Sequence, residues 1–446
     1  MPGHFVAIVG GAIAGSVAAE ILVDHGIRVA VIEQNPRPYG KIEDGLPRWH
    51  AEQRRQEYAR IDARLRKPGV YFVPCTKLGR DLEFADLCEN WGFSAVILAN
   101  GAWRDRELGV PGSEAYIDRG LVYQNPFIYW FNHKNEKSYS GPRYETPDGA
   151  LVVGGGLASI DVVKVLQIEN YEKALRARGI ETDMHALEKK GIPAICKQHG
   201  VSPEELGIAG CLLIYRRREQ DMPLAQPPDN ATPAQLATTE AVRKKMLRLA
   251  REKYLFRFQE RRMAAGLLVE QDRVVGLRVV ETRVEGRRAE PVTGTEHELR
   301  APLVISSIGS VPEAIPGIAR TGEYYPFQGD DLPRYAGSDH VFGVGNVVSG
   351  QGNIRVSLEH SKAVTSEIVA NYIGVGDEAF DLSGWRQAAE TRGALQAAAV
   401  QQRTWPPLTE DRVAQLEQRI RGLQLRVGYD CDYDTWIARV TPPDLE

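Results

Sequence analysis

The sequence contains few cysteines, and their spacing argues against paired thiols. Its 446 residues include Cys75, Cys88, Cys196, Cys211 and Cys431, and no two of them form a C-x-x-C pair. This odd, scattered set disfavours a disulfide framework, a thiol-redox centre and a self-contained iron–sulfur cluster. We expect the cysteines to be small buried hydrophobes in a reducing, cytoplasmic setting.

Long apolar runs and an excess of one charge are also missing. No run approaches the roughly 20 apolar residues that cross a bilayer. The N-terminal apolar stretch contains Glu20 and Asp24 and lacks a basic start, unlike a signal peptide. The 55 basic and 59 acidic residues leave a net charge of −4, which gives no reason to expect nucleic-acid or bulk membrane binding. The length allows about two or three domains.

A first nucleotide-binding pattern opens the chain. The apolar run Phe5–Val9 leads into the segment Gly10–Gly15, a helical pattern, and a second apolar run that ends in Glu33. This strand, turn, helix, strand, acid order is typical of a dinucleotide-binding fold. The helix start can hold a pyrophosphate, and Glu33 can accept hydrogen bonds from an adenosine ribose. Ala12 replaces the usual middle glycine, and its small methyl group is expected to be tolerated.

The pattern recurs after the apolar run Leu151–Val153, with Ser159 in place of the third glycine. The next strand is expected at Cys211–Tyr215, after a polar and helical insertion at about 167–208. Arg216-Arg217-Arg218 follows that strand directly. An acid at this position favours a ribose with free hydroxyls, whereas arginine favours a 2′-phosphate. The first site is therefore interpreted as an FAD site and the second as an NADPH site, unless the arginines are simply a solvated charge run.

Several further segments, in the same order along the chain, carry a family resemblance. They are Pro38–Pro47, Ala95–Ala102, Leu108–Gly112, Tyr215-Arg216-Arg217 with Met222-Pro223, Ser307–Pro312 and His340–Asn346. With the two glycine loops they make residues 5–370 resemble the flavoprotein family of adrenodoxin reductase, bacterial ferredoxin–NADP reductases of that type and the glutamate synthase small subunit. The resemblance implies an α/β protein with two Rossmann-like three-layer domains, the NADP domain being inserted in the FAD domain. Expected boundaries are 1–105 with 330–400 for FAD, 106–329 for NADP and 401–446 for an extension.

The glycine loops and the resemblance together define the expected cofactor residues. For FAD they are Gly10, Ala12, Ile13, Ala14, Gly15, Glu33, Gln34, Gly40, Lys41, Leu46, Asn100, Gly101, Gly345, Asn346, Gly352, Asn353 and Ile354. For NADPH they are Gly154, Gly156, Leu157, Ala158, Ser159, Arg216 and Arg217.

Three departures from the family pattern concern the flavin site. Asn100 replaces threonine, Asn346 replaces an acid common in relatives, and Glu43-Asp44 stands where basic or aromatic residues are usual. The two carboxylates are expected close to the flavin or nicotinamide ring.

His50 lies near the family position of a histidine beside the flavin, and its alternative role is that of a satisfied structural histidine. Arg355, Glu359 and His360 are candidates for which a helix surface is the simpler expectation. The segment Arg54–Lys67 is rich in arginine. This segment would attract an acidic ferredoxin or flavodoxin, or it is an ordinary solvated helix face.

The resemblance implies electron transfer between NADPH and a one-electron carrier such as ferredoxin. Alternatives are an electron-input subunit of a larger, possibly bifurcating, complex whose partner carries iron–sulfur clusters, and a flavoenzyme acting directly on an organic substrate. The tail contains a break at Trp405-Pro406-Pro407 and an apolar stripe from Val413 to Leu423. The stripe could pack on its own chain, form a dimer or hold a partner.

Overall fold

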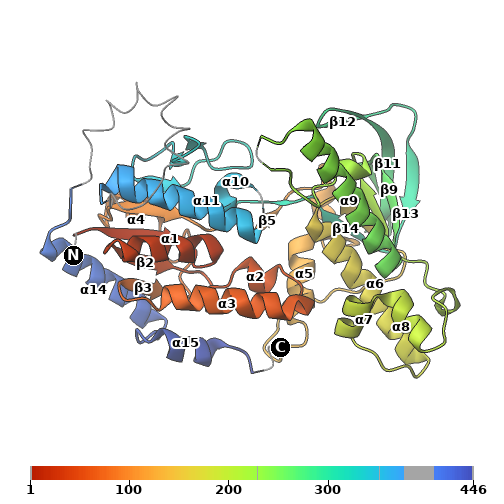
Figure 1. Cartoon of the computed structure of the whole chain (residues 1–446), viewed down its shortest axis with the longest axis horizontal. Helices are drawn as coiled ribbons and strands as arrows, with labels where there is room; N and C mark the ends of the chain where they lie inside the picture. The colour runs from red at the N-terminus through yellow and green to blue at the C-terminus, as the bar shows by residue number, and fades with distance from the viewer. Residues whose placement is uncertain (1–2, 229, 351, 376–405, 444–446) are drawn as a thin grey trace. The chain divides into compact units, whose positions relative to one another are not determined.

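The computed structural model describes residues 3–228, 230–350, 352–375 and 406–443. They form two compact units (Figure 1). The first lies within 1–43, 51–104 and 310–445, and the second comprises 44–50 and 105–309. The chain returns to the first unit at Ser310, whereas the boundary predicted from the sequence is at 330. Gln351, Trp405 and the part of the expected FAD domain from 376 to 400 lie outside the described residues.

The first unit is built on a seven-stranded sheet. The strand order is β16-β17-β18-β4-β1-β2-β3, and the strands from β18 to β3 are parallel. The strands are β1 (Phe5–Val9), β2 (Arg28–Ile32), β3 (Val70–Val73), β4 (Ala95–Leu98), β16 (Phe327–Gln328), β17 (Arg334–Tyr335) and β18 (Val341–Gly343). From β1 the chain proceeds to β2 and β3 on one side of the sheet, and β4 is added on the other side of β1. The strand order therefore reverses between β1 and β4.

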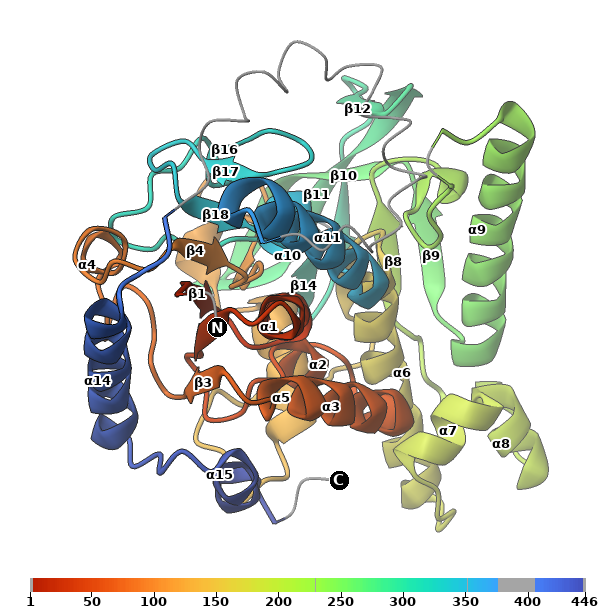
Figure 2. The same ribbon diagram turned by 60° about the vertical axis from the view of Figure 1, so that its left-hand side comes forward.

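Both faces of this sheet are covered, which gives three layers (Figure 2). Val6 and Ile8 of β1 point into a core shared with one set of helices, and Phe5 and Ala7 point into the core on the other face. The first face carries α1 (Ile13–Asp24), α3 (Ala51–Leu65) and α11 (Ile354–Glu367), and the second carries α4 (Phe84–Glu89) and α14 (Glu410–Arg426). Shorter helices are α2 (Lys41–Asp44), α10 (Asn346–Ser349) and α15 (Tyr433–Val440).

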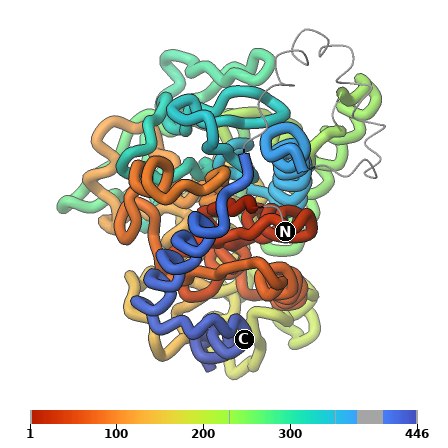
Figure 3. The backbone as a smooth tube through the Cα atoms, turned by 90° about the vertical axis from the view of Figure 1, so that its left-hand side faces the viewer, coloured from red at the N-terminus to blue at the C-terminus, as the bar shows by residue number. Residues whose placement is uncertain are grey.

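The C-terminal stripe packs on its own chain. Val413, Leu416 and Ile420 of α14 are buried in the second of these cores, and α14 lies along the edge strand β3 (Figure 3). Gln424 Nε2 also donates a hydrogen bond to the Phe72 carbonyl of that strand at 2.8 Å. This segment therefore completes the first unit, as the first of the three alternatives predicted.

The second unit contains a five-stranded parallel sheet of order β6-β14-β7-β8-β9. Its strands are β6 (Leu121–Tyr123), β7 (Leu151–Gly154), β8 (Leu212–Tyr215), β9 (Arg257–Glu260) and β14 (Val304–Ser307). One face packs on α5 (Gln124–His133), α6 (Leu157–Ala177) and α9 (Pro233–Tyr254). The other packs on an antiparallel sheet of β10 (Arg262–Glu270), β11 (Arg273–Glu285), β12 (Arg288–Pro291) and β13 (His297–Arg300).

The expected insertion is helical, but it begins later than the predicted residue 167. Residues 167–177 continue α6, and α7 (Met184–Lys190) and α8 (Ile192–Gln198) follow. Further along the insertion, Ser202 Oγ accepts a hydrogen bond from Glu205 N at 3.3 Å, and a short 3-10 turn follows. The short strands β5 (Arg104–Asp105) and β15 (Ser310–Val311) pair where the chain passes between the units.

The prediction of two Rossmann-like α/β domains, one inserted in the other, is confirmed by this topology. No helix within the described ranges is long and apolar enough to cross a membrane.

Candidate nucleotide-binding sites

Most residues expected to bind FAD lie at one edge of the first sheet. They belong to the loops after β1, β2, β4 and β18, and these strands are parallel. The carboxyl ends of parallel strands meet at the same edge, and ligands bind there where the strand order reverses. The loops are in close contact: a Cβ added to Gly40 would lie 2.9 Å from Ala12 Cβ, and one added to Gly345 would lie 2.6 Å from Ala14 Cβ.

Glu33 supports the glycine loop from within. Its carboxylate is 4% exposed and accepts hydrogen bonds from Gly11 N at 2.8 Å and Asn35 N at 2.9 Å. A carboxylate has about four lone-pair sites, so a carboxylate at this strand end can accept from a ribose hydroxyl as well as from backbone N–H groups. Gly15 permits the close packing of α1 on β1, because an added Cβ would lie 1.8 Å from the Gly10 carbonyl oxygen.

Helix α11 fixes the loop after β18 to the glycine loop. Gly345 N donates a hydrogen bond to His360 Nδ1 at 3.0 Å, and Ser361 Oγ donates to the Ala14 carbonyl at 2.7 Å. Burial lowers the pKa of His360, which agrees with a neutral ring whose Nδ1 is an acceptor. His360 is one of the candidates that the sequence indicated, and it is half-buried against this loop instead of lying on an exposed helix surface. No sequence signal indicated Ser361, because its contact joins segments 347 positions apart.

Two buried side-chain oxygens at this edge indicate whether the site suits a flavin nucleotide. The side-chain oxygens of Asn100 and Asn346 are buried, and neither has a hydrogen-bond partner among the described residues. A Cβ added to Gly101, beside Asn100, would meet no atom within 4 Å. Buried acceptors normally have a donor, so a ligand rich in hydroxyl groups, such as FAD, fits this edge.

The two carboxylates that depart from the family pattern are both paired. Glu43, 6% exposed, forms an ion pair with Arg37. Asp44 Oδ1 lies 3.0 Å from His133 Nε2, and the Nδ1 atom of the same ring lies 2.6 Å from Glu136 Oε1. Both acids therefore have cationic or hydrogen-bonding partners within their own unit.

Leu46 and His50 fall in residues 44–50, which belong to the second unit. Asn132 of α5 holds this segment, because its Oδ1 accepts from Arg48 N at 3.0 Å and its Nδ2 donates to the Leu46 carbonyl at 3.1 Å. Trp49 is buried beneath the Lys164 ammonium, which lies 4.7 Å from the ring centre. His50 is half-buried at the end of this segment. Its role beside a flavin stays a prediction.

The second glycine loop joins β7 to α6. Ser159, fully buried, donates its hydroxyl to the Gly156 carbonyl at 2.6 Å, so it closes the first turn of the helix. A Cβ on Gly154 would lie 2.3 Å from the Ser307 carbonyl oxygen, whereas one on Gly156 would meet no atom within 4 Å. Gly154 is therefore constrained by the fold. The space above Gly156 is open to a ligand at the helix N-terminus.

The three arginines after β8 have different surroundings. Arg218 pairs with Asp221 through two hydrogen bonds, of 2.9 and 3.0 Å. Arg217 donates to Tyr215 Oη at 2.8 Å and to the Asp221 carbonyl at 3.1 Å. Arg216 is exposed, and no residue in the described ranges bonds to its guanidinium. Arg216 is thus the arginine whose full set of donors is available to a phosphate.

The basic side chains of the segment Arg54–Lys67 have partners within the first unit. Arg55 and Arg60 pair with Glu52 and Glu57 on the same helix. The remaining cations contact more distant partners, in the pairs Arg64–Glu20, Lys67–Asp24, Arg66–Asp434 and Arg54 with the Glu43 carbonyl. These contacts favour the solvated helix face over a dedicated docking surface for an acidic ferredoxin.

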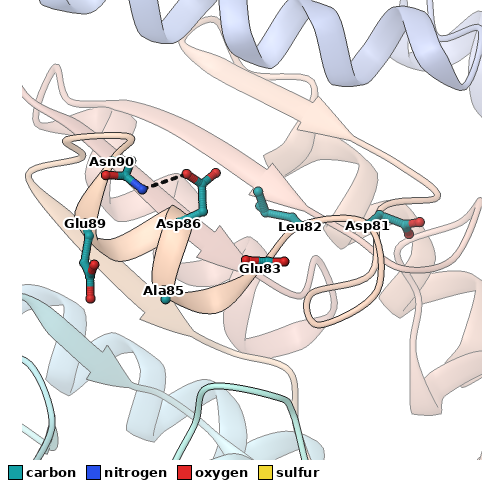
Figure 4. Close-up of a pocket in the computed structure, with 7 residues that line it drawn as sticks. All are labelled: Asp81, Leu82, Glu83, Ala85, Asp86, Glu89 and Asn90. Carbon is teal, nitrogen blue, oxygen red and sulfur yellow. Dashed lines mark hydrogen bonds between the residues drawn. The ribbon is translucent and has the colours of Figure 1, made fainter.

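A shallow pocket of about 390 Å³ lies elsewhere on the first unit, at the start of α4 (Figure 4). Its lining residues are Asp81, Leu82, Glu83, Ala85, Asp86, Glu89 and Asn90. Asp86 accepts hydrogen bonds from Asn90 Nδ2 at 3.0 Å and Trp91 Nε1 at 2.7 Å, so it stabilises the end of α4. None of the predicted cofactor residues line this pocket.

Known proteins resemble this chain over part or most of its length. The family described as an NAD(P)-binding Rossmann-like domain matches residues 8–50. The chain is 25% identical to the NADPH-ferredoxin reductase FprA of Mycobacterium leprae, over 84% of this chain and 85% of that protein. It is 31% identical to the mitochondrial NADPH:adrenodoxin oxidoreductase of Arabidopsis thaliana, over 36% of this chain and 32% of that protein. The chain resembles the adrenodoxin reductase family of flavoproteins.

Further relatives match over different lengths. The glutamate synthase (NADPH) small chain of Halomonas elongata is 26% identical over 77% of this chain and 64% of its own length. The match thus spans about a third of the Arabidopsis protein and just under two thirds of the Halomonas protein. The solved structure of Mycobacterium tuberculosis FprA in complex with NADPH superposes with a TM-score of 0.65. At 19% identity over 96% of this chain and 91% of FprA, it shows a shared fold.

Proposed function

We propose that this chain is an FAD-dependent oxidoreductase that passes electrons between NADPH and a one-electron carrier such as ferredoxin. FAD would bind at the edge of the first sheet, and NADPH would bind at the second glycine loop. The observation that carries it is the contrast between the two strand ends. A buried acid follows β2, and an exposed arginine to which no residue in the described ranges bonds follows β8. The relatives named as NADPH-dependent reductases of ferredoxin and adrenodoxin support the same assignment.

The residues of the chain would bind and orient the two nucleotides. Glu33 would accept hydrogen bonds from the adenosine ribose of FAD, and the amide oxygens of Asn100 and Asn346 would accept from further hydroxyl groups. At the second loop, the N-terminus of α6 would face the pyrophosphate and Arg216 the 2′-phosphate. FAD, when bound, supplies hydride acceptance and single-electron release. The protein contributes alignment and electrostatics, for which no protein nucleophile is needed.

The test is anaerobic reduction of the bound flavin, followed by its absorbance. Wild-type protein should carry FAD, be bleached faster by NADPH than by NADH at equal concentration, and then reduce oxidised ferredoxin. Absence of FAD, or no bleaching by either nucleotide, would overturn the proposal.

Arg216→Ala and Arg218→Ala form a matched pair for the nucleotide preference. Arg216→Ala should raise the dissociation constant for NADPH roughly tenfold or more, the scale of a lost charge-assisted hydrogen bond, and leave that for NADH nearly unchanged. Arg218→Ala, whose guanidinium is already bound to Asp221, should keep the preference for NADPH. Equal losses in the two variants would refute the role of Arg216.

A second candidate function is electron input to a larger complex. The match to a glutamate synthase small chain over 77% of this chain favours it. In that case a partner subunit with iron–sulfur clusters would replace free ferredoxin as acceptor, and it would co-purify with the chain. We further propose a reducing cytoplasmic location, which the free state of all five cysteines supports.

A further inference from the structure

The last helix of the chain is attached to the loop that follows β2. Trp436 of α15 is 3% exposed, and its Nε1 donates a hydrogen bond to the Pro36 carbonyl at 2.8 Å. Pro36 lies in residues 34–40, which we name the β2 loop. A buried tryptophan N–H usually has an acceptor, and here the acceptor belongs to a segment 400 positions earlier in the chain.

A second contact joins the same two segments through one carboxylate. Asp62 of α3 accepts hydrogen bonds from Tyr433 of α15 at 2.8 Å and from Tyr39 of the β2 loop at 3.1 Å. Tyr39 also stacks on Tyr58, with 3.9 Å between ring centres. The β2 loop is therefore attached at Pro36, directly to α15, and at Tyr39, through the Asp62 carboxylate that α15 also contacts.

The β2 loop in turn lies directly on the glycine loop of the first site. A Cβ added to Gly11 would lie 2.9 Å from Pro38 Cβ, and one added to Gly40 would lie 2.9 Å from Ala12 Cβ. Neither glycine has room for a side chain, so the two loops pack closely, and a shift of the β2 loop would alter the shape of the glycine loop because close-packed segments transmit displacement.

From these contacts we infer that α15 is a positioning element for the first dinucleotide site: through Trp436 and Tyr433 it holds the β2 loop against the glycine loop and so sets the affinity for the bound dinucleotide. This inference rests on the proposed function of the first unit as an FAD site. It gives the C-terminal segment a role in cofactor retention in addition to covering β3.

The test uses the full chain, freed of flavin and titrated with FAD while flavin fluorescence is followed. Trp436→Phe retains an aromatic ring and removes the donor to Pro36, and Tyr433→Phe removes the bond to Asp62. Each should weaken FAD binding roughly three- to tenfold, the scale of one buried hydrogen bond. The affinity for NADP⁺, measured in the same preparations, should stay at the wild-type value because its site lies in the other unit.

The matched control is Ile420→Val on α14. Ile420 is 1% exposed and packs in the core on the α4 face of the sheet, so the substitution lowers stability without touching the β2 loop. Its FAD affinity should equal that of wild type. Unchanged FAD affinity in both aromatic variants would overturn the positioning role, as would an equal loss in Ile420→Val. Failure of wild type to bind FAD would instead overturn the proposed function.

Discussion

The two glycines of the second loop allow a test that separates folding from nucleotide binding. Gly156 caps α6 with φ of −90° and ψ of 177°, a conformation that alanine adopts without strain, and an added Cβ would meet no atom within 4 Å. An added Cβ on Gly154 would lie 2.3 Å from the Ser307 carbonyl oxygen and 2.8 Å from Ser159 Cβ. Substitution to alanine should therefore leave the free energy of unfolding nearly unchanged at Gly156 and lower it at Gly154.

The magnitudes follow from these surroundings. Gly156→Ala gains about 0.4–1 kcal/mol by restricting the unfolded chain and loses a similar amount because alanine is a poorer N-cap. Its free energy of unfolding should then stay within about 0.5 kcal/mol of wild type. Gly154→Ala forces atoms apart in a packed interior, which costs about 1–3 kcal/mol or more. Urea denaturation of the two variants measures both values.

Nucleotide binding, in contrast to stability, should be impaired by the substitution at Gly156. If a pyrophosphate lies against Gly156, the new methyl group occupies its place, and the dissociation constant for NADPH should rise at least about tenfold, or ~1.4 kcal/mol. FAD content should be unaffected. A Gly156→Ala variant that binds NADPH like wild type would refute the assignment of this loop. A Gly154→Ala variant of unchanged stability would refute the packing argument.

Two further predictions concern single carboxylates. Glu33→Gln leaves one acceptor oxygen for the N–H groups of Gly11 and Asn35. We therefore expect a loss of about 1–3 kcal/mol in unfolding free energy and a lower FAD content on purification. A variant with the stability and FAD content of wild type would refute this role of Glu33. Burial raises the pKa of Asp161 from 3.8 to about 6. This folded-state pKa lies above the unfolded value. The contribution of protonated Asp161 to the free energy of unfolding is therefore fully present below pH 4 and is lost as pH rises through 6, by up to about 3 kcal/mol. Asp161→Asn should flatten the stability profile between pH 4 and 7, and an unchanged slope would contradict the pKa.

The elements that the sequence predicted well are those with a strong local pattern. The apolar runs that became β1, β2, β7 and β8 are each bounded by glycine, an acid or arginine, and their parallel pairing brings the loops together at one edge. The convergence of the expected FAD residues therefore required only the rule that parallel strands end on the same side.

The features that escaped prediction depend on partners far away in the chain. Asp44 contacts His133, 89 positions later, and Trp436 contacts Pro36, 400 positions earlier. The boundary at Ser310 was missed for a related reason. Ile315 and Ile318 lie in an irregular segment without periodic pattern, and only the folded chain shows that they are buried in the core of the first unit.

The construction of the two sites suggests different lifetimes for their ligands. The first glycine loop is braced by Glu33, by Ser361 of α11 and by the β2 loop, so its shape is set by several segments before any ligand binds. Such preorganisation reduces the ordering cost of binding and favours a ligand that stays bound. The proposed second site would offer the open position at Gly156 and the exposed Arg216, whose side chain would lose rotamer freedom on binding. This asymmetry is what an enzyme needs if FAD is to remain through many cycles while NADPH enters and leaves in each one.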